Sequence, residues 1–113
     1  MTVSTDQTAN QSAAQQPAIA AFTSEARIAT GSATRYLGQL CKHFGHKVPA
    51  ALEGDHGWIA FDFGRCHLAA SDSELSLHNA SATAEDLQRL EQVIASHLER
   101  FAFREKLQIT WQR

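Results

Sequence analysis

The segment that decides the fold is residues 48–79, VPAALEGDHGWIAFDFGRCHLAASDSELSLHN. Apolar side chains alternate with polar or small ones in four short runs, and this period of two is typical of half-buried strands. The runs are residues 48–53, 58–63, 66–70 and 75–79. Their connections, GDHG, GR and SDSE, are rich in turn-forming residues. The segment therefore predicts four consecutive antiparallel strands joined by hairpins.

The connections also predict the register of the sheet. A two-residue turn at residues 64–65 places Asp62 opposite His67, and a four-residue loop at residues 71–74 places His67 opposite His78. The GDHG connection is treated as a four-residue loop as well. All three hairpins then agree on one apolar inner face, and a slip by one residue would turn a strand's apolar side chains outward. The predicted inner face consists of Val48, Ala50, Leu52, Ile59, Phe61, Phe63, Cys66, Leu68, Ala70, Leu75 and Leu77.

Two helices and two further strands flank this segment. Residues 24–30, SEARIAT, alternate like a short strand, and residues 33–46 carry an apolar stripe at helical spacing after a potential N-cap, Ser32. A second helix begins at Thr83. Residues 107–111, LQITW, predict a last strand with Leu107, Ile109 and Trp111 on one side. The resulting order, β-α-β-β-β-β-α-β, predicts an α+β fold in which two helices pack on one face of an antiparallel sheet.

The composition divides the chain into two parts. Residues 1–22 consist mainly of Ser, Thr, Gln, Asn and Ala, and such a segment cannot bury enough apolar surface to offset the entropy of ordering it. We therefore expect a disordered polar tail over residues 1–22 and a single α+β domain over residues 23–113. The tail lacks the features of a secretory signal, and no stretch approaches the roughly 20 apolar residues of a membrane helix.

Charge and cysteine content narrow the class of protein. The net charge is −2, and the sequence has no positive face of the kind that binds a phosphate backbone, so we expect no nucleic-acid partner and no membrane partner. Two cysteines do not make a disulfide framework, which favours a cytoplasmic protein with reduced thiols. Cys41 and Cys66 are expected to pack as small apolar residues.

Two groups of residues have the chemistry of a metal site. His43 and His46 point about 60° apart on the predicted helix, so they suit one ion if a third ligand arrives from elsewhere. Asp62, His67 and His78 fall in one row on the outer face of the predicted sheet, a ligand set suited to iron, zinc or copper. The alternatives are a helix C-terminus, where His and Lys favour the helix dipole, and an ordinary solvated face.

A third group suits an anion. His97, Arg100 and Arg104 lie along one flank of the second predicted helix, near its end. Two guanidiniums and an imidazole suit a carboxylate or a phosphate. The alternative is that these cations pair with neighbouring acidic residues at the helix C-terminus.

Two segments of the chain also resemble a known family. ARIATGSATRYLGQLCKHFGHKVP (residues 26–49) and HLERFAFREKLQITW (residues 97–111) are similar to the bacterial domain-of-unknown-function family 2218, over about residues 24–112. The resemblance implies a small single-domain protein and brings no established activity. Related domains attached to siderophore-interacting flavoprotein reductases imply a link with iron handling. The motif positions are Arg27, Arg35, Tyr36, Cys41, His43, His46, Lys47, His97, Arg100, Phe101, Phe103, Arg104 and Glu105.

The outer face of the predicted sheet is unusual. It carries small, mostly apolar residues where charged ones are expected, which favours contact with a second copy of the chain or with a reductase partner. The predicted register places Ala51, Ala60, Ala69 and Ser76 in one row across the middle of this face, with Trp58 nearby.

These observations favour a small cytoplasmic binding or accessory domain of iron or siderophore metabolism. It would bind a transition-metal ion, such as iron, zinc or copper, or an anionic metal chelate. The alternative is a protein-interaction or dimerisation module that uses the sheet face without metal or catalysis. A weaker option is an enzyme with a His general base, but the sequence identifies no catalytic residue.

Overall fold

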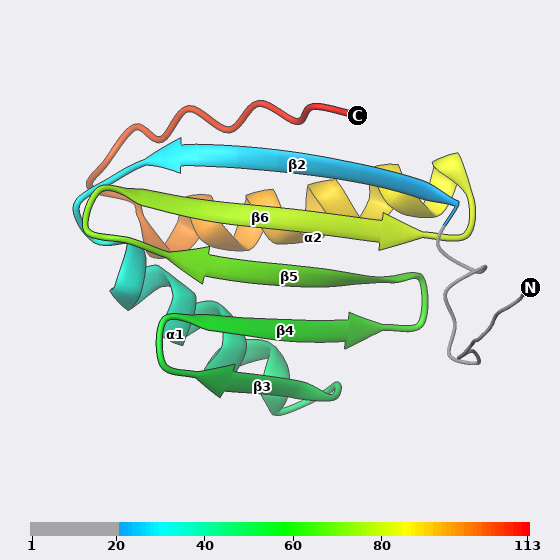
Figure 1. Ribbon diagram of the computed structural model, residues 1–113, viewed down its shortest axis with the longest axis horizontal. Helices are drawn as coiled ribbons and strands as arrows, with labels where there is room; N and C mark the ends of the chain where they lie inside the picture. Colours follow the sequence, from blue (N-terminus) through cyan, green and yellow to red (C-terminus); the bar gives the residue numbers. More distant parts are fainter. Residues whose placement is uncertain (1–20) are drawn as a thin grey trace, which may run out of the picture.

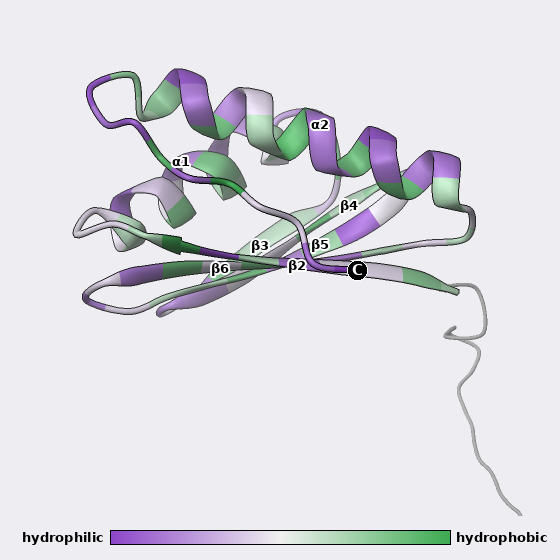
Figure 2. Ribbon diagram, turned by 90° about the horizontal axis from the view of Figure 1, so that it is seen from above, coloured by the Kyte–Doolittle hydropathy of each residue, from purple (hydrophilic) through white to green (hydrophobic). Residues whose placement is uncertain are grey.

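A computed structural model describes residues 21–113, which form one antiparallel sheet of five strands with two helices on one of its faces (Figure 1, Figure 2). This confirms the predicted α+β class and the predicted order from the first strand to the second helix. The elements are β2 (Phe22–Ala29), α1 (Ala33–Gly45), β3 (Ala50–Glu53), β4 (His56–Phe61), β5 (Gly64–Ala70), β6 (Glu74–Ser81) and α2 (Ala84–Phe101).

The strands lie in the order β2-β6-β5-β4-β3. Strands β3 to β6 follow one another as hairpins, as their short connections predict, and β2 joins the sheet by pairing with β6. Helix α1 lies beneath the β3–β4 side of the sheet and α2 beneath the β2–β6 side (Figure 1). The C-terminal end of α2 lies beside α1, where Phe101 contacts His43.

The predicted register is right for one hairpin and wrong for the other two. His67 lies opposite His78 as predicted. Between β4 and β5, however, Phe61 pairs with Gly64, so the turn consists of residues 62–63, and Trp58 takes the place opposite His67. Gly64 explains the shift, because a Cβ at this position would lie 2.7 Å from the carbonyl oxygen of Ala80 on β6. Only glycine allows this approach, so β5 begins at residue 64 and the turn precedes it.

The hairpin between β3 and β4 is also tighter than predicted. Glu53 pairs with His56, which leaves a two-residue turn in place of the expected four-residue loop. Gly54 in this turn has a φ of +62°, a left-handed conformation that glycine adopts without steric cost. The strand therefore resumes at His56, two residues earlier than the apolar pattern indicates.

In both wrong hairpins the pairing is shifted by an even number of residues. The side chains predicted to face inward therefore still lie on the inner face. Ile59, Cys66, Leu75 and Leu77 are fully buried in the core. The exception is Leu52, which is 50% exposed because it lies on the edge strand opposite Gly57, where no side chain covers it.

The helices bury the apolar stripes that the sequence predicts. In α1 the buried residues are Ala33, Tyr36, Leu37, Leu40, Cys41 and Phe44, and in α2 they include Leu87, Leu90, Ile94 and Leu98. The side chain of Thr83 accepts a hydrogen bond of 3.0 Å from the amide of Asp86, which confirms the predicted cap of α2. Ser32 stands at the N-cap of α1 as predicted, but its side chain makes no capping hydrogen bond.

The predicted last strand is the one element that does not form. Residues 107–111 are extended and run beside β2 (Figure 1), but they reach it through a single bridge, in which Glu25 and Gln112 exchange two backbone hydrogen bonds of 2.8 Å. The side chains predicted to share one side, Leu107, Ile109 and Trp111, pack against the core. Apolar packing therefore holds this segment where the ladder hydrogen bonds of a strand are missing.

The predicted tail, residues 1–22, lies almost entirely outside the described residues, and Phe22 is already the first residue of β2. Neither helix described for residues 21–113 is long and apolar enough to cross a membrane.

Candidate functional site

A pocket of about 350 Å³ opens where the chain leaving α2 turns back toward the start of α1. Its lining comes from two segments that are far apart in the sequence. The residues are Arg35, Tyr36 and Gln39 from α1, and Phe101, Phe103, Arg104 and Glu105 from the end of α2 and the turn after it. All seven positions belong to the two segments that carry the family resemblance, and all except Gln39 are motif positions.

Local secondary structure determines where the residues on the two sides of this pocket lie. Arg35 and Gln39 are four residues apart on α1, so they share one exposed face of the helix. Helix α2 ends at Phe101, and the carbonyl of its C-cap residue, Ala102, accepts a hydrogen bond of 2.9 Å from the amide of Glu105. This turn directs Arg104 and Glu105 back toward α1.

A hydrogen-bond network fastens the two sides together. The buried hydroxyl of Tyr36 donates to one carboxylate oxygen of Glu105, across 69 positions of sequence. The hydroxyl of Thr30 donates to the other oxygen at 2.9 Å and accepts from the amide of Ser32 at 3.1 Å. The bond from Tyr36, and then that from Thr30, lowers the pKa of Glu105. Burial, followed by the bond to Glu105, raises the pKa of Tyr36.

The pocket has an excess of positive charge. Arg35 and Arg104 are exposed, and neither forms an ion pair with an acidic side chain of residues 21–113. Each guanidinium lies over a neighbouring ring, at 5.5 Å from the centroid of Tyr36 for Arg35 and 5.4 Å from that of Phe103 for Arg104. The charge of Arg35 also helps to lower the pKa of Glu105, but neither guanidinium is within ion-pair distance of a carboxylate among the described residues. Two such cations beside the aromatic side chains of Phe101 and Phe103 suit an anion with apolar or aromatic parts.

Two histidines lie beside this pocket, one on each helix. The ring centroids of His43 and His97 are 5.1 Å apart, and Phe101, which lines the pocket, lies 5.5 Å from His43. His97 Nδ1 lies 2.8 Å from the carbonyl oxygen of Val93, so Nδ1 carries the proton and donates it. Burial, followed by the charge of His97, lowers the pKa of His43.

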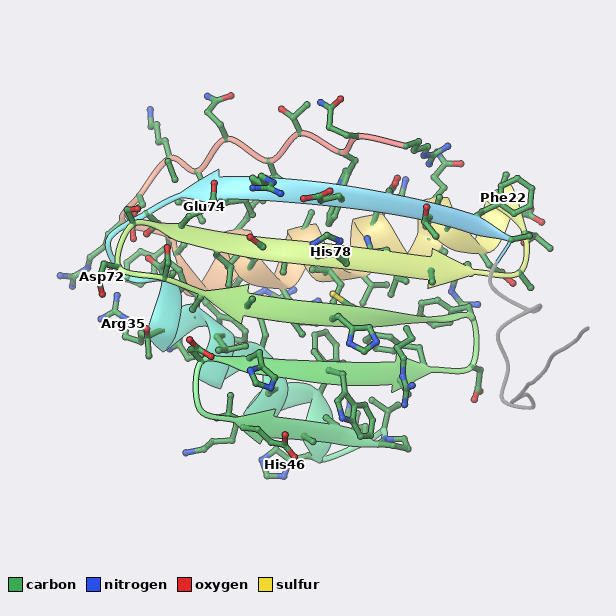
Figure 3. The ribbon with its side chains drawn as sticks, viewed as in Figure 1. Phe22, Arg35, His46, Asp72, Glu74 and His78 are labelled. Carbon is green, nitrogen blue, oxygen red and sulfur yellow. The ribbon has the colours of Figure 1, made fainter. Side chains whose placement is uncertain are left out.

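The structure separates the residues of the predicted anion group. Arg104 lines the pocket with Arg35, while His97 lies next to His43, and Arg100 is exposed in the last turn of α2. His46, predicted to share an ion with His43, is the exposed C-cap residue of α1, at the opposite end of this helix from Arg35 (Figure 3).

The predicted row of Asp62, His67 and His78 is wrong, because the register shift moves Asp62 into the turn between β4 and β5. His67 and His78 do lie opposite each other on the open face, where Nε2 of His78 is 3.6 Å from a carboxylate oxygen of Glu25. Within residues 21–113, no group of three or more His, Cys, Asp or Glu side chains is arranged to hold a metal ion.

The small residues of the outer face do not form the predicted continuous row. Ala69 pairs with Ser76 as predicted, but the shifted register places Ala51 opposite Trp58 and Ala60 opposite Arg65. The guanidinium of Arg65 lies 4.5 Å above the Trp58 ring. A contact with a second copy of the chain or with a reductase through this face stays a prediction.

Both cysteines are buried free thiols, as expected. Burial raises the pKa of Cys41, and burial followed by the nearby Cys41 raises the pKa of Cys66. Only the thiolate form of cysteine acts as a nucleophile or a metal ligand. The raised pKa values keep both thiols protonated, so Cys41 and Cys66 serve as packing residues.

Sequence reasoning did not assign the pocket. Arg35, Gln39 and His43 recur at intervals of four on one flank of α1, and this regularity is the signal that marks a common face. Nothing in the sequence indicates that the turn after α2 brings Arg104 and Glu105 to the same face.

The fold and the pocket describe a small two-layer α+β domain with an open pocket between α1 and the end of α2. The sequence model of a bacterial family described as "Uncharacterized protein conserved in bacteria (DUF2218)" matches residues 25–112. The chain therefore belongs to this family, as the resemblance predicted. A similar solved structure is the "NMR structure of PA4090 from Pseudomonas aeruginosa", with 37% sequence identity, a TM-score of 0.70, and coverage of 80% of this chain and 95% of that one. No curated protein matches the chain.

Proposed function

We propose that this domain binds a small anionic ligand in the pocket between α1 and the turn after α2. The observation that carries this proposal is that two exposed guanidiniums, Arg35 and Arg104, line one pocket, and neither forms an ion pair among the described residues. The bond from Tyr36 to Glu105 fixes the frame of this pocket. A volume of about 350 Å³ falls within the range of small-molecule pockets.

The composition of the pocket indicates the class of ligand. Guanidiniums favour carboxylate, phosphate or catecholate groups, and the exposed ring of Phe103 offers a surface for planar or apolar parts. An anionic metal chelate combines these features, and the family link with siderophore-interacting reductases supports this ligand class. We therefore propose an accessory role in the handling of an anionic iron chelate.

The pocket favours binding over catalysis. Its carboxylate, Glu105, already accepts hydrogen bonds from two hydroxyls and has a lowered pKa, so it is poorly suited to remove a proton. The hydroxyl of Tyr36 has a raised pKa and is committed to Glu105.

Isothermal titration calorimetry with citrate, ferric citrate and inorganic phosphate tests the proposal. We expect binding that weakens at least tenfold in the double variant Arg35→Gln/Arg104→Gln, because each charge-assisted hydrogen bond contributes about 1.5–3 kcal/mol. Arg89→Gln is the matched control, since this exposed guanidinium lies over Phe63, away from the pocket.

Two results would contradict the proposal. One is that none of the three probes binds at millimolar concentration, and the other is that the double variant binds as tightly as the unmodified protein. Tighter binding of ferric citrate than of citrate would support the chelate, and equal binding would restrict the proposal to the free anion.

A further inference from the structure

We propose that His43 and His97 form a two-histidine site for a divalent transition-metal ion that bridges α1 and α2. The two side chains come from different helices, and their ring centroids are 5.1 Å apart with an angle of 44° between the ring planes. The site does not depend on the anion pocket, because it uses neither Arg35 nor Arg104.

The spacing of the rings fits a shared ion. A metal–nitrogen bond of about 2.1 Å places the centre of an imidazole roughly 3.2 Å from the ion. Two such rings at a tetrahedral angle have centres about 5.2 Å apart. The observed 5.1 Å between the ring centroids therefore matches the separation that a shared ion requires.

The hydrogen bond of His97 has the form that metal-binding histidines use. Its Nδ1–H donates to the carbonyl of Val93 at 2.8 Å, which leaves the Nε2 lone pair available for an ion. A ligating histidine generally donates its other ring N–H in this way, and the bond fixes both the tautomer and the orientation of the ring.

Aromatic neighbours hold both imidazoles in place. The ring of Phe44 lies 4.9 Å from that of His43 and 4.7 Å from that of His97, and Phe101 contacts His43 from α2. Rings that packing has already ordered lose less entropy on binding an ion.

The charge around the pair limits the choice of metal. Lys47 and Arg100 lie close enough to act on the charge of His43, and they disfavour a cation. Since no third protein ligand is in reach among the described residues, water or an added ligand completes the coordination. An ion with high intrinsic affinity for imidazole is needed, so we expect Cu²⁺ to bind more tightly than Ni²⁺ or Zn²⁺.

Calorimetric titration of the full chain without an affinity tag, using Cu²⁺, Ni²⁺ and Zn²⁺ chlorides, tests this site. We expect one equivalent of Cu²⁺ to bind, and His43→Gln and His97→Gln each to weaken binding at least tenfold. His46→Gln and the double variant His67→Gln/His78→Gln remove the other candidate histidines and should leave the affinity unchanged. Circular dichroism of each variant verifies that it is folded.

The outcomes separate this site from its competitors. Loss of binding in His46→Gln but not in His97→Gln would place the ion on α1 alone and overturn the proposal. Loss in the His67/His78 variant would place it on the sheet, and absence of binding to all three metals would also overturn the proposal. Arg35→Gln/Arg104→Gln should retain Cu²⁺ binding, which separates this result from the test of the anion pocket.

For a variant that fails to fold, long-range proton–nitrogen NMR spectra of the unmodified protein give a second test. Addition of Zn²⁺ should shift the Nε2 resonance of His97 and the ring resonances of His43. Shifts confined to other histidines would overturn the assignment.

Discussion

Replacement of Gly57 by alanine tests the pairing of β3 with β4 and the packing of α1 against these strands. A Cβ at this position would lie 2.5 Å from the backbone oxygen of Ala51 and 2.8 Å from Sγ of Cys41. Both distances are shorter than ordinary contacts, and the first involves backbone of the neighbouring strand, so a strand or the helix must move.

The expected loss of stability follows from this overlap. Added methyl groups in packed regions cost about 1–3 kcal/mol, and two contacts below 3.0 Å place Gly57→Ala near the upper end, at about 2–3 kcal/mol. For a domain of this size, that loss corresponds to a decrease of about 10–20 °C in the melting temperature. In urea we expect the midpoint to fall by about 1–2 M.

Gly38→Ala is the matched control. Gly38 lies within α1, and a Cβ there has no neighbouring atom within 4 Å. The same chemical change should therefore raise the free energy of unfolding by about 0.5–1 kcal/mol, because alanine is the better helix former. Urea unfolding followed by circular dichroism measures both variants. Equal stability of Gly57→Ala and the unmodified protein would refute the pairing of β3 with β4 and the position of α1 beneath them.

Three further predictions concern single interactions. Tyr36→Phe should raise the pKa of Glu105 toward its ordinary value of 4.5, as measured by carbon NMR, since the bond from Tyr36 is the largest cause of the lowered pKa. Because the folded pKa of Glu105 lies below the unfolded one, its contribution to stability is present above about pH 5 and decreases at lower pH, so the variant should lose less stability on acidification. Thr83→Ala should lower the free energy of unfolding by about 1 kcal/mol in urea, and an unchanged value would refute its bond to the amide of Asp86 as a cap. Cys66 should react with a disulfide reagent only after denaturant is added, and rapid reaction of the native protein would contradict its burial.

The period of the apolar pattern was sufficient to predict which side of each strand faces the core. Alternation has a period of two, so an error of two or four residues in pairing leaves Ile59 and Leu77 on the inner face. The turns could not be predicted as well, because the approach of β6 that selects Gly64 depends on a strand encountered later in the chain.

The last segment shows a different limit. Its alternation predicts that Leu107, Ile109 and Trp111 share one side, and this side packs against the core. Alternation does not report the ladder hydrogen bonds that define a strand. The chain meets β2 at one pair of residues, Glu25 and Gln112.

The candidate site was predicted only in part, for a similar reason. Arg104 and His43 were recognised as residues with suitable chemistry, but their partners, Arg35 and His97, come from the other helix. Helical spacing relates residues within one helix, whereas the turn after Ala102 and the bond from Tyr36 to Glu105 decide which helices meet.

The most direct test of the anion pocket is a map of backbone amide chemical shifts during titration with citrate. The account predicts that the changes concentrate at Arg35, Gln39, Phe103 and Arg104, and that they decrease as the salt concentration rises. Changes centred on the open sheet face around His67 and His78, or no changes at millimolar citrate, would contradict it.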